Sequence, residues 1–168
     1  LGNVNTIGPR ACYDEGKRFA ETMVKTYADI YQLETKIIRP FRIYGPRMTL
    51  DEGHMIPDFI SHALDSQDLV IYGSADFKTS FCYVSDCLSA ALKFMETEVS
   101  GPINIGSDVD VALTEVAQTI ITLLGSSSAI TYAPPLIFMT PLALPDISQA
   151  KKLLGWEPAT KLDDGLSK

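Results

Sequence analysis

Apolar residues recur at intervals of three and four in the first part of the chain, between residues 13 and 31. This spacing places them along one side of a helix, and they are Phe19, Ala20, Met23, Val24, Tyr27, Ala28 and Tyr31. The pattern predicts an amphipathic helix over 13–31.

A short β-rich run follows, with the sequence TKIIRPFRIYGPR at 35–47. β-branched residues favour a strand, and Gly45 and Pro46 break any regular element. Because proline has no backbone N–H group to donate to a strand ladder, we expect the strand to fray after Arg39, at Pro40.

Apolar runs of helical and strand length alternate along the rest of the chain. Helices are expected at 55–64, 87–96, 113–125 and 146–156, and short strands at 69–72, 80–84, 102–106 and 129–135. This alternation is typical of α/β proteins. No repeat or obvious linker interrupts it.

Residues at the ends of these helices indicate where the helices start and stop. Ser85 and Asp86 are candidate caps for the helix at 87–96, and Asp146 or Ser148 for the last helix. Glycine accepts a left-handed backbone and often follows a helix. The glycines expected in this role are Gly125 and Gly155.

The composition fits one globular domain and argues against several kinds of partner. Of the 168 residues, 46% are hydrophobic, and the formal net charge is −7. An acidic chain is unsuited to nucleic acid or to an anionic membrane surface. No apolar run approaches the roughly 20 residues that span a bilayer. The first residues lack the regions of a signal peptide, so we expect a cytoplasmic protein.

The three cysteines, Cys12, Cys82 and Cys87, have no spacing typical of a metal site. Their odd number favours reduced thiols, as in the cytoplasm. We expect all three to be ordinary packing residues, and the sequence predicts no metal site.

Tyr13 and Lys17 are the candidate catalytic pair, because residues four apart lie on the same side of a helix. A phenol in water ionises only near pH 10, but an adjacent ammonium favours the phenolate. Such a phenol can exchange a proton with a substrate hydroxyl while a cofactor carries the hydride. Tyr-x-x-x-Lys is frequent by chance, so an aromatic and a lysine that merely pack along one helix are the alternative.

No Gly-x-Gly-x-x-Gly or Gly-x-x-Gly-x-x-Gly loop occurs in the chain. Dinucleotide-binding folds carry such a loop at their first strand–helix turn, where backbone amides meet the pyrophosphate. We therefore expect that the chain does not bind a nicotinamide cofactor by itself.

An ordered series of motifs extends from about residue 2 to residue 166: GPRACYDEGKRFAETM, RPFRIYGPRM, SFCYVSD, PINIG and PDISQAKKLLGWEP. The series resembles the extended short-chain dehydrogenase/reductase family, which includes NAD-dependent epimerases and dehydratases. It is most similar to the UDP-glucuronate decarboxylase branch. The resemblance covers only the second half of the family's fold.

The resemblance implies the C-terminal part of a Rossmann-like, doubly wound parallel sheet with a small α/β substrate-binding lobe. Residues 1–168 then form a single partial domain. Residues 1–50 hold the catalytic helix and a late Rossmann strand, and residues 51–168 hold mostly the substrate-binding lobe with returning Rossmann segments. Family members commonly dimerise through the catalytic helix and a neighbour, so a homodimer is expected for the complete enzyme.

The resemblance also implies a reaction on a nucleotide sugar. The tyrosine matching Tyr13 deprotonates the 4-hydroxyl group while the C4 hydride passes to NAD, and the lysine matching Lys17 holds the nicotinamide ribose. The 4-keto acid loses carbon dioxide, and reduction of the ketone converts UDP-glucuronate into UDP-xylose. Tyr27 matches a substrate-side tyrosine, with a core aromatic as the alternative.

Several positions depart from the family's pattern. Arg42 stands where an asparagine usually addresses the substrate diphosphate, and here it is either a phosphate ligand or a solvated charge. His54 occupies the position at which relatives have an arginine that faces the cofactor. Thr49 and Ile43 fall at other cofactor-side positions.

Two further departures concern the binding of phosphate. Thr79 stands where a nucleotide-binding arginine is usual, and Lys78 is the candidate substitute on the substrate side. The apolar segment FMTPLALPDI at 138–147 replaces an arginine-rich approach. Buried phosphate charges are costly without donors, so the identity of the sugar nucleotide stays open.

The main hypothesis is an NAD-dependent UDP-glucuronate decarboxylase, present here as its C-terminal half. A 4,6-dehydratase or 4-epimerase acting on another nucleotide sugar is the alternative within the family. A truncated, non-catalytic fragment is the alternative outside it, and we expect the 168-residue chain alone to be inactive.

Overall fold

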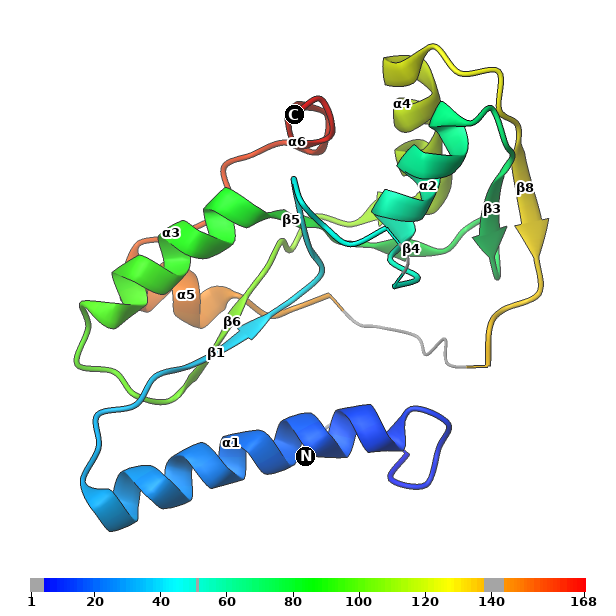
Figure 1. Ribbon diagram of the computed structural model, residues 1–168. Helices are drawn as coiled ribbons and strands as arrows, with labels where there is room; N and C mark the ends of the chain where they lie inside the picture. The colour runs from blue at the N-terminus through cyan, green and yellow to red at the C-terminus, as the bar shows by residue number, and fades with distance from the viewer. Residues whose placement is uncertain (1–4, 51, 138–143) are drawn as a thin grey trace.

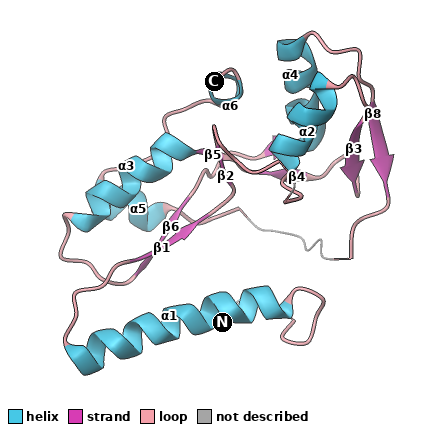
Figure 2. Ribbon diagram, viewed as in Figure 1, coloured by secondary structure: helices cyan, strands magenta, loops and turns pink. Residues whose placement is uncertain are grey.

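The computed structural model describes residues 5–50, 52–137 and 144–168, so most of the segment 138–147 lies outside the described residues. Helices and strands alternate along the chain (Figure 1, Figure 2). Within the described ranges the parallel strand pairs are β1 (Ile37–Pro40) with β6 (Pro102–Ile105), β2 (Ile43–Tyr44) with β5 (Cys82–Tyr83), and β3 (Leu69–Tyr72) with β8 (Ile130–Ala133). The predicted α/β class is confirmed.

Helix α1 (Ala11–Tyr31) is the predicted amphipathic helix and begins two residues before the predicted start. Gln32 caps its end and donates its N–H to the carbonyl of Ala28, and its left-handed backbone (φ 53°) turns the N–H of Leu33 back to the same carbonyl at 3.0 Å. None of its residues is buried, and Figure 1 shows it along one side of the molecule. Glu21 of α1 contacts β1, because its carboxylate accepts two hydrogen bonds from the guanidinium of Arg39, one of them 2.6 Å long.

Strand β1 runs through Pro40, so the expectation that it frays after Arg39 is wrong. Pro40 pairs with Ile105 in parallel register, and the N–H of Phe41 donates to the carbonyl of Ile105 at 2.8 Å. Successive N–H groups of a strand point to alternate sides. The nitrogen of Pro40 therefore points away from β6. The pairing with β6 needs no N–H donor on that far side of the strand.

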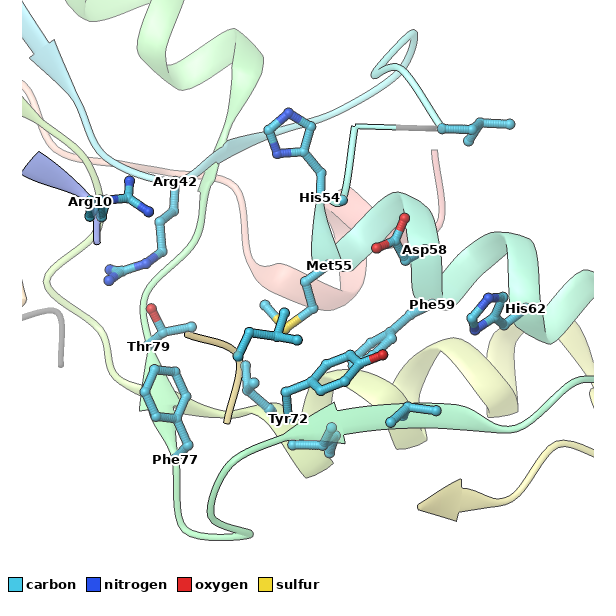
Figure 3. Close-up of a pocket in the computed structure, with 16 residues that line it drawn as sticks. Arg10, Arg42, His54, Met55, Asp58, Phe59, His62, Tyr72, Phe77 and Thr79 are labelled. Carbon is cyan, nitrogen blue, oxygen red and sulfur yellow. The ribbon is translucent and has the colours of Figure 1, made fainter. Parts of the chain in front are cut away.

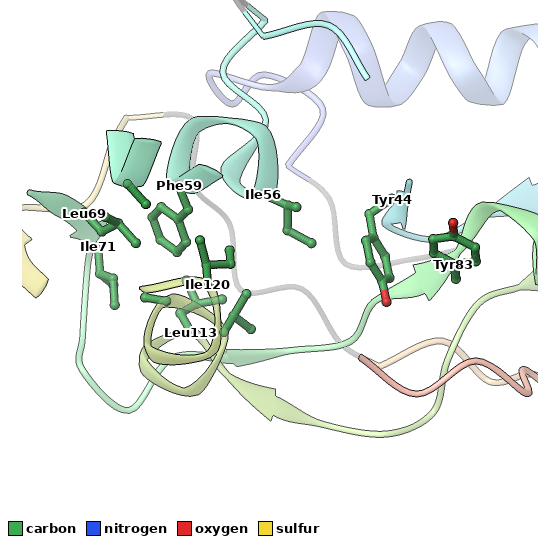
Figure 4. Packing of buried hydrophobic residues seen from close by; sticks show 11 residues of the cluster. Tyr44, Ile56, Phe59, Leu69, Ile71, Tyr83, Leu113 and Ile120 are labelled. Atoms are coloured by element: carbon green, nitrogen blue, oxygen red, sulfur yellow. The ribbon is translucent and has the colours of Figure 1, made fainter. Parts of the chain in front are cut away.

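Two clusters of buried side chains form the core. The first lies where α2 (Met55–Leu64) and α4 (Leu113–Leu124) pack on β3 (Figure 4), and it includes Phe59, Leu69, Ile71, Val116 and Ile120. The second involves β6, α3 (Val84–Met95) and α5 (Ser148–Leu154), and it includes Phe94, Ile103, Ile105, Ile147 and Trp156. Each large side chain removed from water contributes roughly 1.5–3 kcal/mol to folding.

The predicted glycines end two helices, whereas the predicted caps are displaced. α4 and α5 end at Gly125 and Gly155, where φ is 61° and 55°. Ile147 occupies the N-cap of α5, so neither predicted residue does. The Asp146 carboxylate, one residue earlier, still accepts the N–H of Ser148 at 2.9 Å.

Asp86 does not cap α3, which begins at Val84. It instead binds residues 156–160 to that helix through hydrogen bonds. Asp86 is 9% exposed. Its Oδ2 accepts the N–H groups of Ala159 (3.1 Å) and Thr160 (2.8 Å), and its Oδ1 accepts the Thr160 hydroxyl at 3.1 Å. Its backbone carbonyl accepts the Nε1–H of Trp156 at 3.0 Å. These donors compensate a carboxylate withdrawn from water.

The sequence did not indicate the antiparallel pair β4 (Lys78–Thr79) with β7 (Val111–Ala112), nor helix α6 (Leu162–Leu166). Each element is too short for its periodicity to be recognised. Among the described helices, none combines the length and the apolar character that crossing a membrane requires.

The three cysteines are unpaired. Cys82 is fully buried, and burial raises the pKa of its thiol to about 12. Cys87 is partly buried against the second cluster, whereas Cys12 is exposed on α1. The packing expectation is therefore confirmed for Cys82 and wrong for Cys12.

Candidate active site

Tyr13 and Lys17 lie together at the N-terminal end of α1. The Nζ atom of Lys17 is 5.4 Å from the centroid of the Tyr13 ring, and the Cζ atom of Arg10 is 4.8 Å from it. Tyr13 is 54% exposed. The arrangement therefore places a group able to transfer a proton beside an ammonium donor on one accessible surface.

A cavity of about 710 Å³ is walled by α2 and β3 (Figure 3). Part of this wall is apolar and comes from Phe59, Ile71 and Leu113, which also belong to the first core cluster. Because these side chains are held by the core, this part of the wall has a fixed position. The size and apolar wall of the cavity are those of a small-molecule site.

One end of the cavity is cationic. Arg10, just before α1, and Arg42, between β1 and β2, both line it (Figure 3). Burial, and then the charge of Arg10, lowers the pKa of the Arg42 guanidinium. Since Arg10 also lies over the ring of Tyr13, the cationic end adjoins the Tyr13–Lys17 pair.

His54 also lines the cavity, at the N-cap of α2. Its Nε2 atom is 3.4 Å from the Oε2 atom of Glu52. Asp58 and His62, which follow at intervals of four, line the same cavity. Neither residue was predicted from the sequence, although polar residues four apart on an apolar helix lie on the same side of it. In the described parts of the chain, no group of three His, Cys, Asp or Glu residues could hold a metal ion.

Thr79 and Arg10 were likewise not predicted to line the cavity. Thr79 is 2% exposed and lines it, whereas its neighbour Lys78 is exposed and does not. Successive strand residues point to opposite faces, so β4 presents Thr79 to the cavity and Lys78 to solvent.

Three other predicted residues lie away from the cavity. Ile43 is partly buried in β2 and pairs with Cys82. Thr49 is exposed in the segment after β2. Tyr27 is half-exposed, and it lies about 21 Å along the helix from Tyr13 at 1.5 Å per residue. The structure thus brings Arg42 and His54 into one cavity, with Tyr13 and Lys17 adjoining it through Arg10.

A sequence model described as "NAD dependent epimerase/dehydratase family" matches residues 2–106, which include α1 and Arg42. The chain belongs to this family. The family expected from the motifs is therefore confirmed.

Named members of the family resemble the chain over almost its whole length. The chain is 41% identical over 167 residues to UDP-glucuronic acid decarboxylase 1 of Xenopus tropicalis. It is 43% identical over 169 residues to UDP-glucuronic acid decarboxylase 3 of Arabidopsis thaliana. These matches cover 99% and 98% of the chain but only 40% and 48% of the two relatives. The chain thus spans less than half the length of these curated relatives.

Solved structures of the family share the fold. UDP-glucuronic acid 4-epimerase from Bacillus cereus, solved with UDP-glucuronic acid and NAD, superposes with a TM-score of 0.83 at 26% identity over 99% of this chain and 54% of that one. A UDP-N-acetylglucosamine 4-epimerase from Methanobrevibacter ruminantium gives a TM-score of 0.86 at 25% identity over 99% of this chain and 55% of that one. The expected Rossmann-like architecture is confirmed.

Proposed function

We propose that the chain is the C-terminal half of an NAD-dependent UDP-glucuronate decarboxylase that forms UDP-xylose through a 4-keto intermediate. The observation that carries the proposal is the pairing of Tyr13 with Lys17, whose Nζ atom is 5.4 Å from the tyrosine ring on an accessible surface. Identities of 41% and 43% to two decarboxylases support this choice of substrate.

In this proposal Tyr13 removes the proton of the sugar 4-hydroxyl group as C4 is oxidised. The bond between C5 and the carboxylate then breaks, carbon dioxide leaves, and the electron pair is delocalised onto the 4-keto oxygen. The Tyr13 hydroxyl stabilises that oxygen by a hydrogen bond. A proton adds to C5, and Tyr13 returns its proton when the ketone is reduced, so no external oxidant is consumed.

Bound NAD supplies a reversible hydride acceptor. The accessible Lys17 ammonium suits the hydroxyl groups of a nicotinamide ribose, and His54, Thr49 and Ile43 are the further cofactor-side candidates. The described residues offer no glycine-rich loop for the pyrophosphate, so we assign that contact to the half of the enzyme outside this chain.

A nucleotide-sugar 4-epimerase is the second candidate. The solved relatives with TM-scores of 0.83 and 0.86 are 4-epimerases, and an epimerase needs the same exchange of a proton and a hydride at C4. The reactions differ in whether C6 is lost.

The test is turnover of UDP-glucuronate by the full-length protein with NAD, followed by chromatography of the nucleotide sugars. Release of carbon dioxide with formation of UDP-xylose is expected, and Tyr13→Phe should lower kcat about 10²–10⁴-fold with little change in KM. A C4 epimer with all six carbons would overturn the decarboxylase in favour of the epimerase. Equal rates for Tyr13→Phe and the native enzyme would contradict both.

We also infer that the full-length enzyme is a homodimer in the cytoplasm. Support for the dimer comes from α1, which exposes Phe19, Met23 and Ile30. Support for a reducing compartment comes from the three unpaired thiols. Its small-molecule partner in this proposal is the nucleotide sugar. Arg42 is the substrate-side candidate that lines the cavity, whereas the candidates Tyr27 and Lys78 lie away from it.

A further inference from the structure

Helix α3 is apolar on two opposite sides. One side carries Ala90 and Phe94, which are buried in the second core cluster. Leu88 and Leu92 lie about 160° around the helix from Ala90 and Phe94, respectively, at 3.6 residues per turn. They are 58% and 65% exposed, and Met95, one turn beyond Leu92, is 70% exposed. A helix with apolar residues all round is typically covered on every apolar side.

The exposed apolar residues form one row along the helix. Leu88, Leu92 and Met95 are spaced by four and three residues, so their side chains are neighbours on the helix surface. We call these three residues the α3 stripe. Rows with this spacing are the ridges that pack into the grooves of a second helix. The stripe is therefore shaped to receive a helix.

Helix α3 lies along β1, on the side of α5 away from β6. It starts directly after β5, which pairs with β2, the strand that follows β1. Near its other end, the Nζ atom of Lys36, one residue before β1, donates to the carbonyl of Val99 at 2.8 Å and lies 5.3 Å from the centroid of the Phe94 ring. Helix α5 packs on β6 and against α3.

The stripe faces past an unpaired edge of the sheet. Within the described residues β1 pairs only with β6, so its other edge is free. Figure 1 shows α3 and α5 on one face of this strand pair and α1 on the other. Because the stripe lies opposite the core that α3 shares with α5, it points beyond the free edge of β1.

We propose that the α3 stripe packs against a helix from the half of the enzyme outside this chain. The proposal rests on one part of the proposed function, namely that the chain is a C-terminal half. A parallel strand added to the free edge of β1 needs a crossover connection, usually a helix, and parallel sheets have helices on both faces. The matches to the two decarboxylases leave 60% and 52% of those relatives outside the matched part, which is ample length for such a unit.

A second copy of the chain is the alternative occupant of the stripe. The homodimer inferred above uses α1, which lies on the opposite face of the β1–β6 pair (Figure 1). The α3 stripe is therefore separate from that dimer surface. Its contact with the remaining half is a contact within one protein chain.

The first test measures how accessible the stripe is in the full-length protein. A maleimide reagent is added to the Leu92→Cys variant, and modification is followed at that position by mass spectrometry, which separates it from the three native cysteines. We expect labelling to be roughly 100-fold slower than for Lys152→Cys on α5, whose position is exposed, because a covered thiol reacts only when the structure opens locally. Equal labelling rates would overturn the proposal.

The second test measures thermal unfolding of the full-length protein. Leu92→Glu should lower Tm by about 5 °C or more, because it buries a charge in an apolar contact. Ser89→Glu is the matched control: it adds the same charge to the polar side of α3 and should leave Tm within about 2 °C. Leu92→Met keeps the surface apolar and should behave like the native protein. An insoluble Leu92→Glu variant beside two native-like controls would also support the contact, whereas a native Tm would overturn it.

Dilution distinguishes the two occupants. Protection of the thiol in Leu92→Cys should be the same at about 50 and 0.5 µM protein, because a contact within one chain does not depend on concentration. Protection that is lost on dilution would assign the stripe to a second copy and overturn the proposal.

Turnover separates this proposal from the proposed function. A protected thiol in a protein that does not decarboxylate UDP-glucuronate would leave the contact standing and remove the decarboxylase. A freely reactive thiol in an active decarboxylase would do the reverse.

Discussion

At the scale of single residues, one buried carboxylate organises the end of the chain. Asp86 accepts three hydrogen bonds from residues 159–160, and its carbonyl accepts one from Trp156. Hydrogen bonds to charged groups contribute more than neutral ones, and a donor left unpaired inside a protein is costly. Residues 159–160 therefore depend on this side chain for their position.

Replacing Asp86 by alanine should lower the free energy of unfolding by about 2 kcal/mol, because two partly buried N–H groups and the Thr160 hydroxyl lose their acceptor. Thermal unfolding of the full-length protein, followed by fluorescence of Trp156, measures the change. Thr160→Val is the matched control: it removes one of the three bonds and should cost about 1 kcal/mol. An equal effect of the two variants would contradict this account.

The candidate site was predictable from the sequence only where local spacing carries the information. Tyr13 and Lys17 are four residues apart, so helix geometry alone brings them together. The meeting of Arg10, Arg42 and Thr79 joins segments far apart in the chain, and no local pattern reports it. Arg42 and the position of Thr79 could be suspected from the motifs around them, whereas the place of Arg10 needed the fold.

At the scale of elements, α1 is the one described helix without a buried residue. Its side-chain link to β1 is the ion pair between Glu21 and Arg39. The Arg39 hydrogen bond lowers the pKa of the Glu21 carboxyl group from its ordinary value of 4.5. The stabilisation is therefore complete above about pH 4.5 and is lost as the pH falls through the lowered value.

Glu21→Gln should remove this acid-dependent contribution. Because both side chains contact water, we expect the variant's free energy of unfolding to be lower by only about 0.5 kcal/mol at pH 6. Near pH 2 we expect it to equal that of the native protein. Thermal unfolding between pH 2 and 6 measures it. Asp29→Asn is the control, since Asp29 pairs with Lys25 inside α1 and does not join the helix to β1. A larger difference at acid pH than at pH 6 would contradict the sign.

Element boundaries were predictable where backbone chemistry fixes them and not where tertiary contacts do. Gly125 and Gly155 end their helices because glycine accepts the left-handed conformation. The end of β1 was predicted wrongly at Pro40. Whether a strand residue needs an N–H donor depends on which side of it the neighbouring strand lies, and β6 lies on the side that Pro40 does not face. The β4–β7 pair exists only through contacts between distant segments.

At the scale of the whole molecule, the described residues form two core clusters, and the long helix α1 lies outside both. Phe19, Met23 and Ile30 lie about 160–180° around α1 from Glu21, at 3.6 residues per turn. This apolar side therefore points away from β1 and is available to a second copy.

Phe19→Glu should convert the proposed full-length dimer into a monomer at micromolar concentration, because it introduces a charge into the proposed apolar contact. Sedimentation velocity measures the state. Phe19→Leu keeps the surface apolar and should remain dimeric. A monomeric native protein, or a dimeric Phe19→Glu variant, would contradict the homodimer.

The orientation of Pro40 has a consequence for assembly. The outer edge of β1 presents the N–H of Ile38 but no donor two residues later. In the proposed full-length enzyme, a further strand laid along that edge would find its hydrogen-bond ladder interrupted at Pro40. Sliding that strand by two residues would set a different carbonyl opposite the pyrrolidine ring, so the missing donor would favour one register over its neighbours.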